Sequence, residues 1–268
     1  MALLETEDLT VTFGGLHAND GINLEIEAGS FVGLIGPNGA GKTTFIDALT
    51  GFVGTSQGTA TFAGRDLLPM KPHERVAAGM SRTFQSLELF DDLTVEDNLR
   101  VAAERPRWYG YLQDFIMPTR PSGVEDQVAW ALDVLDLREF SDANPGDLSH
   151  GRRKLVGVAR ALAAKPQLLL LDEPAAGLDT AESQVLGGRL RSFLDHDISV
   201  LLIDHDMGLV LNVCDYIYVL DFGQIIAAGT PEEIRTDPVV IRAYLGEQAT
   251  ELQEAGAQEA RAAEDDRS

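Results

Sequence analysis

The residues best suited to hold a phosphate group lie between positions 36 and 44. The segment GPNGAGKT (36–43) fits the pattern G-x4-G-K-[ST]; it follows an apolar stretch and opens a helical one. Glycines let backbone N–H groups converge on phosphate oxygens, and the N-terminus of a helix adds free donors and a favourable dipole. We therefore predict a nucleoside-triphosphate site, rather than a glycine-rich turn with a chance lysine. Its candidate residues are Gly36, Pro37, Asn38, Gly39, Ala40, Gly41, Lys42, Thr43 and Thr44.

Two acidic residues form the second candidate for chemistry. The segment LLLLDEP (168–174) puts Asp172 and Glu173 at the carboxyl end of a predicted buried strand, the edge where open parallel sheets form ligand sites. Asp172 would hold Mg²⁺ through water. Glu173 would polarise the attacking water, since a general base contributes roughly 10²–10⁴ in rate. The alternative is an acid pair at a helix start, which is common because of the helix dipole. A phosphate loop upstream favours the catalytic interpretation.

A histidine and a basic helix complete the set. His205, in LLIDHDM (201–207), follows another apolar strand, and a lone histidine there is usually a loop residue. In LSHGRRKLVGVARAL (148–162), Ser149 resembles a helix cap before a basic helix, again a phosphate-friendly N-terminus. The alternative for that segment is a plain capped helix with Arg152, Arg153 and Lys154 in solvent.

The elements that must position these residues are predicted from apolar patterning. Short strands are expected at 9–13, 22–26 and 31–35, a hairpin at 58–67 with its turn at Gly64, and further strands at 167–171, 198–203, 216–220 and 224–228. Apolar runs of five or six residues suit parallel strands covered on both faces. Helices are expected at 94–104, 124–137 and about 180–194, and TPEE (230–233) reads as a capping box.

Composition limits the class of protein. Apolar residues are 44% and charged residues 24% of 268, which is ordinary for a folded domain. The formal charge of −22 repels phosphate backbones, so no nucleic-acid partner is expected. A single cysteine, Cys214, excludes an intrachain disulfide and a cysteine-cluster metal site. No apolar run approaches the roughly 18 residues of a membrane span, and no secretory signal is evident, so a membrane role would need another subunit.

Six motifs occur in a specific order: the phosphate loop, Gln85, LSHGR, LDEP, GLD and His205. This order resembles the ATP-binding-cassette (ABC) ATPase family over about residues 3–246. The resemblance implies an α/β fold, with a P-loop NTPase (RecA-like) core, an N-terminal antiparallel β subdomain and an α-helical subdomain inserted at about 86–155. It implies an ATPase domain over 1–246, an acidic flexible tail over 247–268, ATP and Mg²⁺ as cofactors, and ATP hydrolysis.

The resemblance also implies a role for each matching residue. Phe13 would stack on adenine, although a core position is the alternative. Glu173, His205 and Gln85 would be catalytic: His205 would contact the γ-phosphate, and Gln85 would sense Mg²⁺ and touch the membrane subunits. Thr43, Gln85 and Asp172 would hold the metal. Asp179, in AAGLD, would lie in the loop that crosses between two cassettes.

In this family two cassettes close head-to-tail on two ATP molecules, so Ser149 and Gly151 would contact ATP held by the partner cassette. The usual signature is LSGGQ, whereas this chain has LSHGR, with His150 and Arg152 replacing a glycine and a glutamine. The retained serine and second glycine are the expected phosphate-contacting pair. The departure leaves open whether this signature activates the partner's site.

Several segments narrow the subfamily. FGGLHANDGINLEI, RTFQSLELFDDLTVEDNL, AAGLD, HDMGLV and RAYLG resemble ATP subunits of branched-chain amino-acid importers, and LSHG is also similar to urea importers. The resemblance implies uptake of a small polar nutrient, two transmembrane permeases, a second ABC ATPase subunit of the same or a different sequence, and an external solute-binding protein acting indirectly. It implies a peripheral location on the cytoplasmic face. The aromatic residues Trp108, Tyr109, Tyr111 and Phe115 would dock a permease or pack on their own subdomain.

Three other functions are compatible with a cassette of this kind. Cassettes of lipopolysaccharide extraction end similarly and would serve lipid export, but FGGL, RTFQSLELF and the aromatic segment favour import. DNA-clamping cassettes need long coiled coils or zinc modules between their halves, and no sustained heptads or cysteine pairs occur here. A regulatory cassette that binds ATP without turnover is disfavoured by Glu173 and His205.

Overall fold

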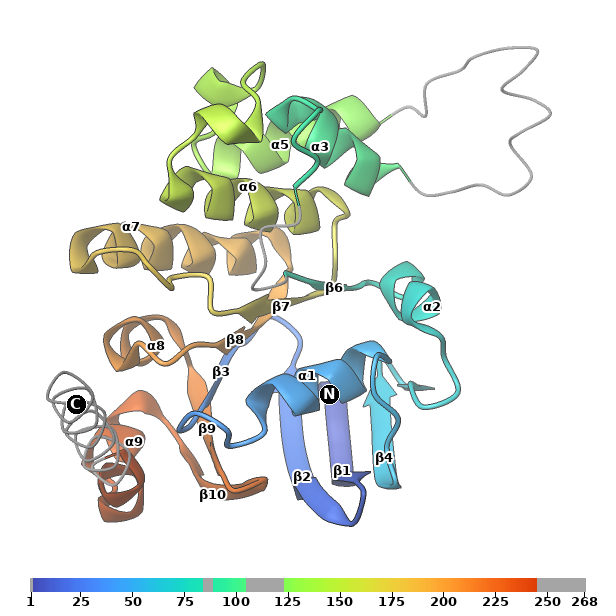
Figure 1. Ribbon diagram of the computed structural model, residues 1–268, viewed down its shortest axis with the longest axis vertical. Helices are drawn as coiled ribbons and strands as arrows, with labels where there is room; N and C mark the ends of the chain where they lie inside the picture. The colour runs from blue at the N-terminus through green and yellow to red at the C-terminus, as the bar shows by residue number, and fades with distance from the viewer. Residues whose placement is uncertain (1, 84–88, 105–122, 245–268) are drawn as a thin grey trace, which may run out of the picture.

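The computed structural model describes residues 2–83, 89–104 and 123–244 (Figure 1). The strands of these residues form two sheets. The larger has six strands in the order β10-β9-β3-β8-β7-β6. Their bounds are β3 Phe31–Ile35, β6 Met80–Arg82, β7 Leu168–Asp172, β8 Ser199–Ile203, β9 Tyr216–Asp221 and β10 Gln224–Gly229. All neighbours are parallel except β9 and β10. The carboxyl ends of β3, β7 and β8 therefore meet at one edge.

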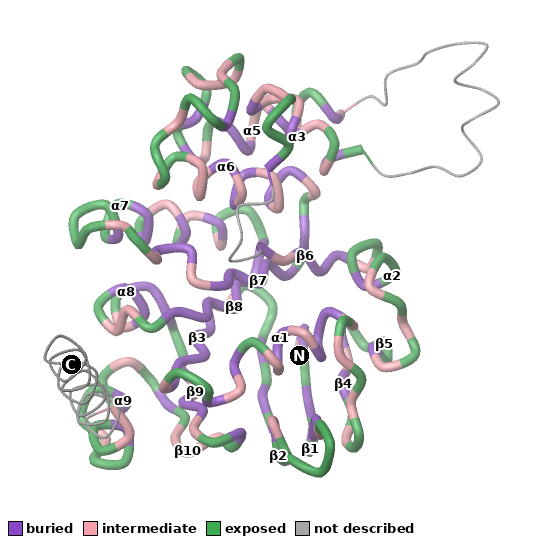
Figure 2. Tube along the Cα trace, in the orientation of Figure 1, coloured by how far each residue is buried: buried purple, intermediate pink, exposed green. Residues whose placement is uncertain are grey.

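The three central strands are covered on both faces, as their apolar runs predict. Every residue of β3, β7 and β8 is buried (Figure 2). Alternate side chains enter opposite cores: Leu168 and Leu170 join the core shared with the antiparallel sheet and α1 (Lys42–Thr50), while Leu169 and Leu171 join the core under the other helices. This period of two is the normal consequence of strand geometry.

The second sheet is antiparallel and has the order β2-β1-β4-β5. Its strands are β1 Ala2–Phe13, β2 Leu16–Glu27, β4 Gln57–Phe62 and β5 Arg65–Asp66. The predicted strands at 9–13 and 22–26 were too short. Their outer halves alternate polar and buried residues, which hides a strand from a search for apolar runs. The hairpin at 58–67 is confirmed, with Gly64 in its turn at φ 72°.

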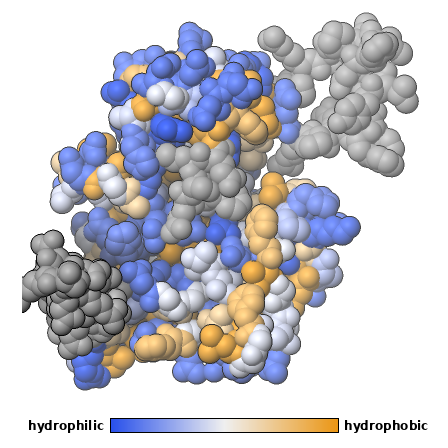
Figure 3. Space-filling model, in the orientation of Figure 1, coloured by the Kyte–Doolittle hydropathy of each residue, from blue (hydrophilic) through white to orange (hydrophobic). Residues whose placement is uncertain are grey.

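Six of the helices in the described residues fall into two groups. The helices α3 (Val95–Ala103), α5 (Val124–Val134) and α6 (His150–Ala163) contact one another and form the layer drawn at the top of Figure 1. The helices α7 (Thr180–Arg191), α8 (Met207–Val213) and α9 (Pro231–Thr236) lie nearer the larger sheet. Short 3₁₀ turns cover Arg138–Phe140, Pro145–Asp147 and Ser192–His196. Hydrophilic residues cover much of the face shown in Figure 3.

Helix ends agree with the sequence where a cap specifies them. Thr94 caps α3, and Thr230 and Glu233 form the predicted capping box of α9. The helix predicted to reach 194 ends at Arg191 and continues as the 3₁₀ turn to His196. The helix α2 (Pro72–Ala77) was not predicted, because six residues are too few to display periodicity.

Candidate functional site

The phosphate loop joins β3 to α1 in a conformation that requires glycine. Gly36 has φ 152°, and a Cβ there would lie 1.9 Å from the carbonyl oxygen of Leu220. Gly41 precedes the helix at φ 105°, and its Cβ would lie 2.4 Å from the carbonyl oxygen of Ala18. The residue before α1, Gly41, makes no side-chain cap to the first turn of the helix. This geometry matches a loop that receives an anion on its backbone.

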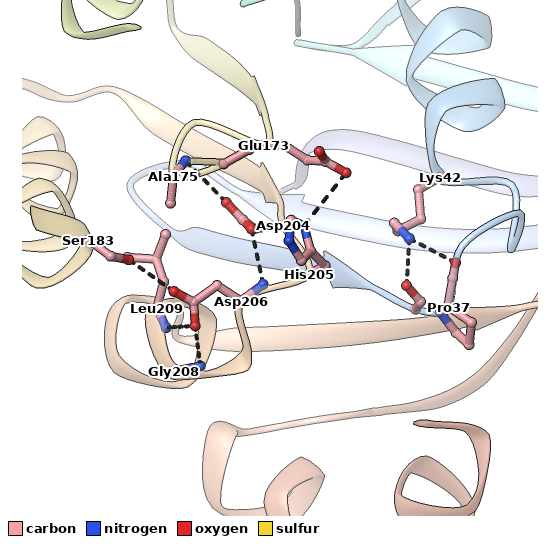
Figure 4. Close-up of polar contacts among 12 residues, drawn as sticks. Pro37, Lys42, Glu173, Ala175, Ser183, Asp204, His205, Asp206, Gly208 and Leu209 are labelled. Carbon is pink, nitrogen blue, oxygen red and sulfur yellow. Dashed lines mark hydrogen bonds and ion pairs between the residues drawn. The ribbon is translucent and has the colours of Figure 1, made fainter. Parts of the chain in front are cut away.

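The Lys42 side chain folds over this loop. Its ammonium group donates to the carbonyl oxygens of Gly36, at 2.5 Å, and Pro37, at 2.9 Å (Figure 4). The residue is 7% exposed. The loop therefore holds its cation beside the backbone that would face phosphate. Around it, Asn38, Gly39 and Thr43 are exposed, Ala40 is buried, and Thr44 is partly buried.

Glu173 and His205 follow neighbouring strands and meet at the same edge. His205 Nδ1 lies 3.8 Å from Glu173 Oε1 and 3.6 Å from Asp204 Oδ1 (Figure 4). The side chain of His205 is 59% exposed and that of Glu173 is 22% exposed. Glu173 has φ 49°, a left-handed conformation that L-residues rarely adopt, and its N–H donates to Ile203 at 2.8 Å. The fold thus brings the predicted base and histidine together.

The carboxylate of Asp172 lies deeper and binds a residue that sequence reasoning missed. Arg82, at the end of β6, pairs with Asp172 Oδ2 at 3.0 Å and with Asp47 Oδ1, on α1, at 2.5 Å. Burial raises the pKa of Asp172, and the Arg82 guanidinium opposes that shift. The other carboxylate oxygen, Oδ1, is buried without a hydrogen-bond partner among the described residues.

That unpartnered oxygen is what a water-mediated metal site needs, because a buried carboxylate oxygen is otherwise left unsatisfied. The Thr43 hydroxyl at the start of α1 supplies a second oxygen of the kind that Mg²⁺ prefers. These residues fit the cation. Within the described ranges, no group of three or more His, Cys, Asp or Glu side chains is arranged for a metal.

Asp204 is a second residue of the site that the sequence analysis did not identify. Its position directly before His205 could have indicated it. It is fully buried. Its carboxylate accepts from Ala175 N–H at 3.4 Å and from Asp206 N–H at 3.0 Å. Burial raises the pKa of Asp204, while these backbone donors oppose the shift. The residue therefore ties the loop after β8 to the loop that carries Glu173.

Ser149 caps a helix as predicted, and Asp179 caps another. Ser149 Oγ accepts from Arg152 N–H at 3.4 Å at the start of α6, and Asp179 accepts from Glu182 N–H at 2.8 Å at the start of α7. A groove of about 520 Å³ between α6 and α7 is lined by Ser149 and Gly151. The alternative of a plain capped helix placed Lys154 in solvent, and this part of it was wrong, since the Lys154 ammonium group contacts two backbone carbonyls.

The remaining predicted residues are placed as follows. Phe13 ends β1 and is 52% exposed, so the alternative that made it a core residue was wrong. Gln85 and the aromatic residues Trp108, Tyr109, Tyr111 and Phe115 lie outside the described residues, as does the tail at 247–268. Within the described part of the chain, no helix has the length and apolar character to cross a bilayer.

A phosphate loop after one parallel strand, with an acid pair after a nearby strand of the same sheet, defines the class of P-loop nucleoside triphosphatases. Comparison with known proteins makes the class specific. Residues 19–176 match the ABC transporter family, and residues 224–250 match the branched-chain amino acid ATP-binding cassette transporter family. The chain belongs to the ABC transporter ATPase family, whose members bind nucleotide.

Two relatives align with this chain over almost their whole length. The high-affinity branched-chain amino acid transport ATP-binding protein BraF of Pseudomonas aeruginosa is 40% identical over 252 residues, which cover 91% of this chain and 98% of BraF. LivG of Escherichia coli K12 is 39% identical over 250 residues, with the same coverage. The crystal structure of an ABC transporter cassette in its ADP conformation has a TM-score of 0.81 and 31% identity, covering 92% of this chain and 99% of that one. The predicted fold class is confirmed.

Proposed function

We propose that the chain is the ATP-binding and ATP-hydrolysing subunit of an ABC importer that powers uptake of branched-chain amino acids, or a similar small polar nutrient, through partner permeases. The observation that carries the ATPase chemistry is the convergence of Lys42, Asp172, Glu173 and His205 at one edge of the sheet. The cargo class is supported by the match at 224–250 and by the relatives' names.

Each residue of the site has a role in this proposal. Gly36 to Thr44 hold the triphosphate, with Lys42 on the β- and γ-phosphates and Phe13 stacking on the base. Glu173 accepts a proton from the attacking water, and His205 contacts the γ-phosphate with Gln85 nearby. Asp172, Thr43 and Gln85 hold Mg²⁺, which supplies charge neutralisation of the phosphates when bound.

Partner chains complete the proposal. A second ABC ATPase subunit, identical or not, would present its nucleotide to Ser149, Gly151 and Asp179 of this chain. Two transmembrane permeases would hold the pair at the cytoplasmic face of the membrane, and a solute-binding protein would deliver cargo from outside. Residues 1–246 would form the ATPase domain, with the helical subdomain at about 86–155 inserted, and 247–268 a flexible acidic tail.

Lipid export, the alternative with the same chemistry, has no comparable support. The family that matches residues 224–250 is one of amino-acid transport, and that segment includes the whole of β10 and α9. Substrate class nevertheless resides in the permeases and the binding protein rather than in the cassette, so the partners are the appropriate readout.

The test is native purification of the tagged full chain from detergent-solubilised membranes, with mass spectrometric identification of the partners. We expect two polytopic permeases, a cassette partner and an external binding protein whose ligand can then be assayed. Recovery with lipid-bridge or envelope-assembly proteins would contradict the importer and leave the ATPase roles intact. The matched control is a tagged exposed-surface variant, Arg138→Met, which should recover the same partners.

A further inference from the structure

The N-terminal turn of α6 packs against the loop 173–179. Gly151 lies directly over it, since a Cβ on this residue would lie 2.9 Å from the side chain of Leu178. One turn later, the Lys154 ammonium group donates to the carbonyl oxygen of Glu173 at 3.3 Å and to that of Ala176. The helix that Ser149 caps is thus joined directly to the backbone of the predicted catalytic base.

The loop is held from its other side by Asp204. The Asp204 carboxylate accepts from the N–H of Ala175, so Lys154 binds carbonyl oxygens and Asp204 binds an amide within the same four residues. The two side chains also attract each other electrostatically. Burial lowers the pKa of Lys154, while the charges of Asp204 and Glu173 raise it. A cation from α6 and an anion from the end of β8 therefore bracket the loop 173–176.

These contacts on both sides of the loop explain how Glu173 keeps an unfavourable backbone conformation. Glu173 has φ 49°, and a non-glycine residue keeps this sparsely populated conformation only when its surroundings impose it. The Glu173 N–H is anchored to Ile203 on β8, and the Glu173 carbonyl is anchored to Lys154 on α6. Both peptide groups that flank the Glu173 Cα are thereby fixed, and with them the direction of its side chain.

We propose that Lys154 is a positioning residue for ATP hydrolysis: it ties α6 to the loop 173–176 and holds Glu173 in the orientation of a general base. The proposal rests on the proposed function in taking Glu173 as that base. Lys154 also couples α6 to Glu173. A movement of the Ser149 end of α6 would therefore shift Glu173 through the hydrogen bonds of the Lys154 side chain.

The experiment compares Lys154→Met and Lys154→Arg in the full chain with Arg153→Met as the matched control. Arg153 is the adjacent residue of α6 and pairs only weakly, at 3.4 Å, with the exposed Asp91. Loss of orientation at a reacting group costs about 10- to 100-fold in rate, so we expect kcat of Lys154→Met to fall by that factor.

The KM for ATP and the binding of a fluorescent ATP analogue should stay near wild type, because the phosphate loop is untouched. Lys154→Arg should recover most of the rate, and Arg153→Met should keep it.

A second readout needs no turnover. Backbone hydrogen exchange of the nucleotide-free chain should quicken at residues 173–178 in Lys154→Met, and should not change in α1. If Lys154→Met does not fold, Lys154→Gln replaces it, because its shorter side chain cannot span both carbonyls. Wild-type kcat and wild-type exchange in either variant would overturn the proposal, as would equal losses in kcat and nucleotide affinity that Lys154→Arg fails to restore. A wild-type chain without ATPase activity would instead count against the proposed function, and the exchange experiment would still decide the role of Lys154.

Discussion

Arg82 balances the buried carboxylate on which the predicted metal site depends. Its side chain is 7% exposed and that of Asp172 only 2%, so this ion pair is largely removed from solvent. Removing one partner of such a pair leaves an uncompensated buried charge. We expect Arg82→Met to lower the free energy of unfolding by about 3–5 kcal/mol, measured by urea denaturation.

The control for this prediction is an ion pair of similar length on the surface. Arg138 pairs with Asp133, and both side chains are more than half exposed. Solvent and salt screen such a pair, so Arg138→Met should leave the urea midpoint unchanged. Equal destabilisation by the two substitutions would contradict the view that burial makes the Arg82 pair important.

Residues with a local pattern could be predicted from the sequence, and residues with only distant partners could not. Gly36, Lys42 and Thr43 belong to one short motif, and the spacing of its residues is enough to predict a phosphate-binding loop. Arg82 acquires its role from Asp172, ninety residues away, through the pairing of β6 with β7. Lys154 likewise meets Glu173 only because α6 packs over the loop after β7.

At the scale of elements, the C-terminal end of α1 depends on a side chain from α2. Arg75 Nη1 donates to the carbonyl oxygens of Ala48 and Leu49 at 2.6 and 2.7 Å, and Nε donates to Met70 at 3.1 Å. Ala48 and Leu49 lie in the last turn of α1, where the helix itself offers few donors, and Ala48 accepts in addition from the Gly51 N–H. Arg75 is 4% exposed. The residue therefore caps the helix that begins with Lys42.

We expect Arg75→Met to lower the free energy of unfolding by about 2–4 kcal/mol, because buried carbonyls lose a charged donor. Chemical denaturation followed by circular dichroism measures the loss. Arg65→Met, on the exposed strand β5, is the matched control and should lie near wild type. A stability of Arg75→Met within error of that control would show that water replaces the guanidinium without cost.

Elements with strong apolar runs or caps were predicted well. The strand at 31–35 and the capping box at 230–233 are confirmed at the predicted residues. The extra length of β1 and β2 was missed, since half of each strand faces solvent and its polar residues resemble a loop. The pairing of β1 with β2 on one side and with β4 on the other supplies what those segments lack in local pattern.

At the scale of the whole molecule, acidic residues outnumber basic ones by 43 to 21, which gives the formal charge of −22. Repulsion among like charges destabilises a compact state, and added salt screens it over a distance of about 10 Å at 0.1 M. The same salt weakens surface ion pairs such as that of Arg191 with Asp215, but these contribute little.

We therefore expect the thermal midpoint to rise when KCl is increased from low concentration to about 1 M, well beyond the concentration at which surface charges are screened. Differential scanning fluorimetry measures the shift, with sucrose of matched osmolality as the uncharged control. A midpoint that falls with KCl would mean that attractive pairs outweigh the repulsion in the folded chain.

Glu173 is the proposed general base at the edge shared by β3, β7 and β8. The most direct test is ATP turnover by the purified full chain, wild type against Glu173→Gln, with nucleotide binding measured in parallel. We predict that Glu173→Gln binds ATP as the wild type does while its turnover falls by about 10²-fold or more, because the general base is lost. Turnover of Glu173→Gln near the wild-type rate would show that Glu173 is not the general base.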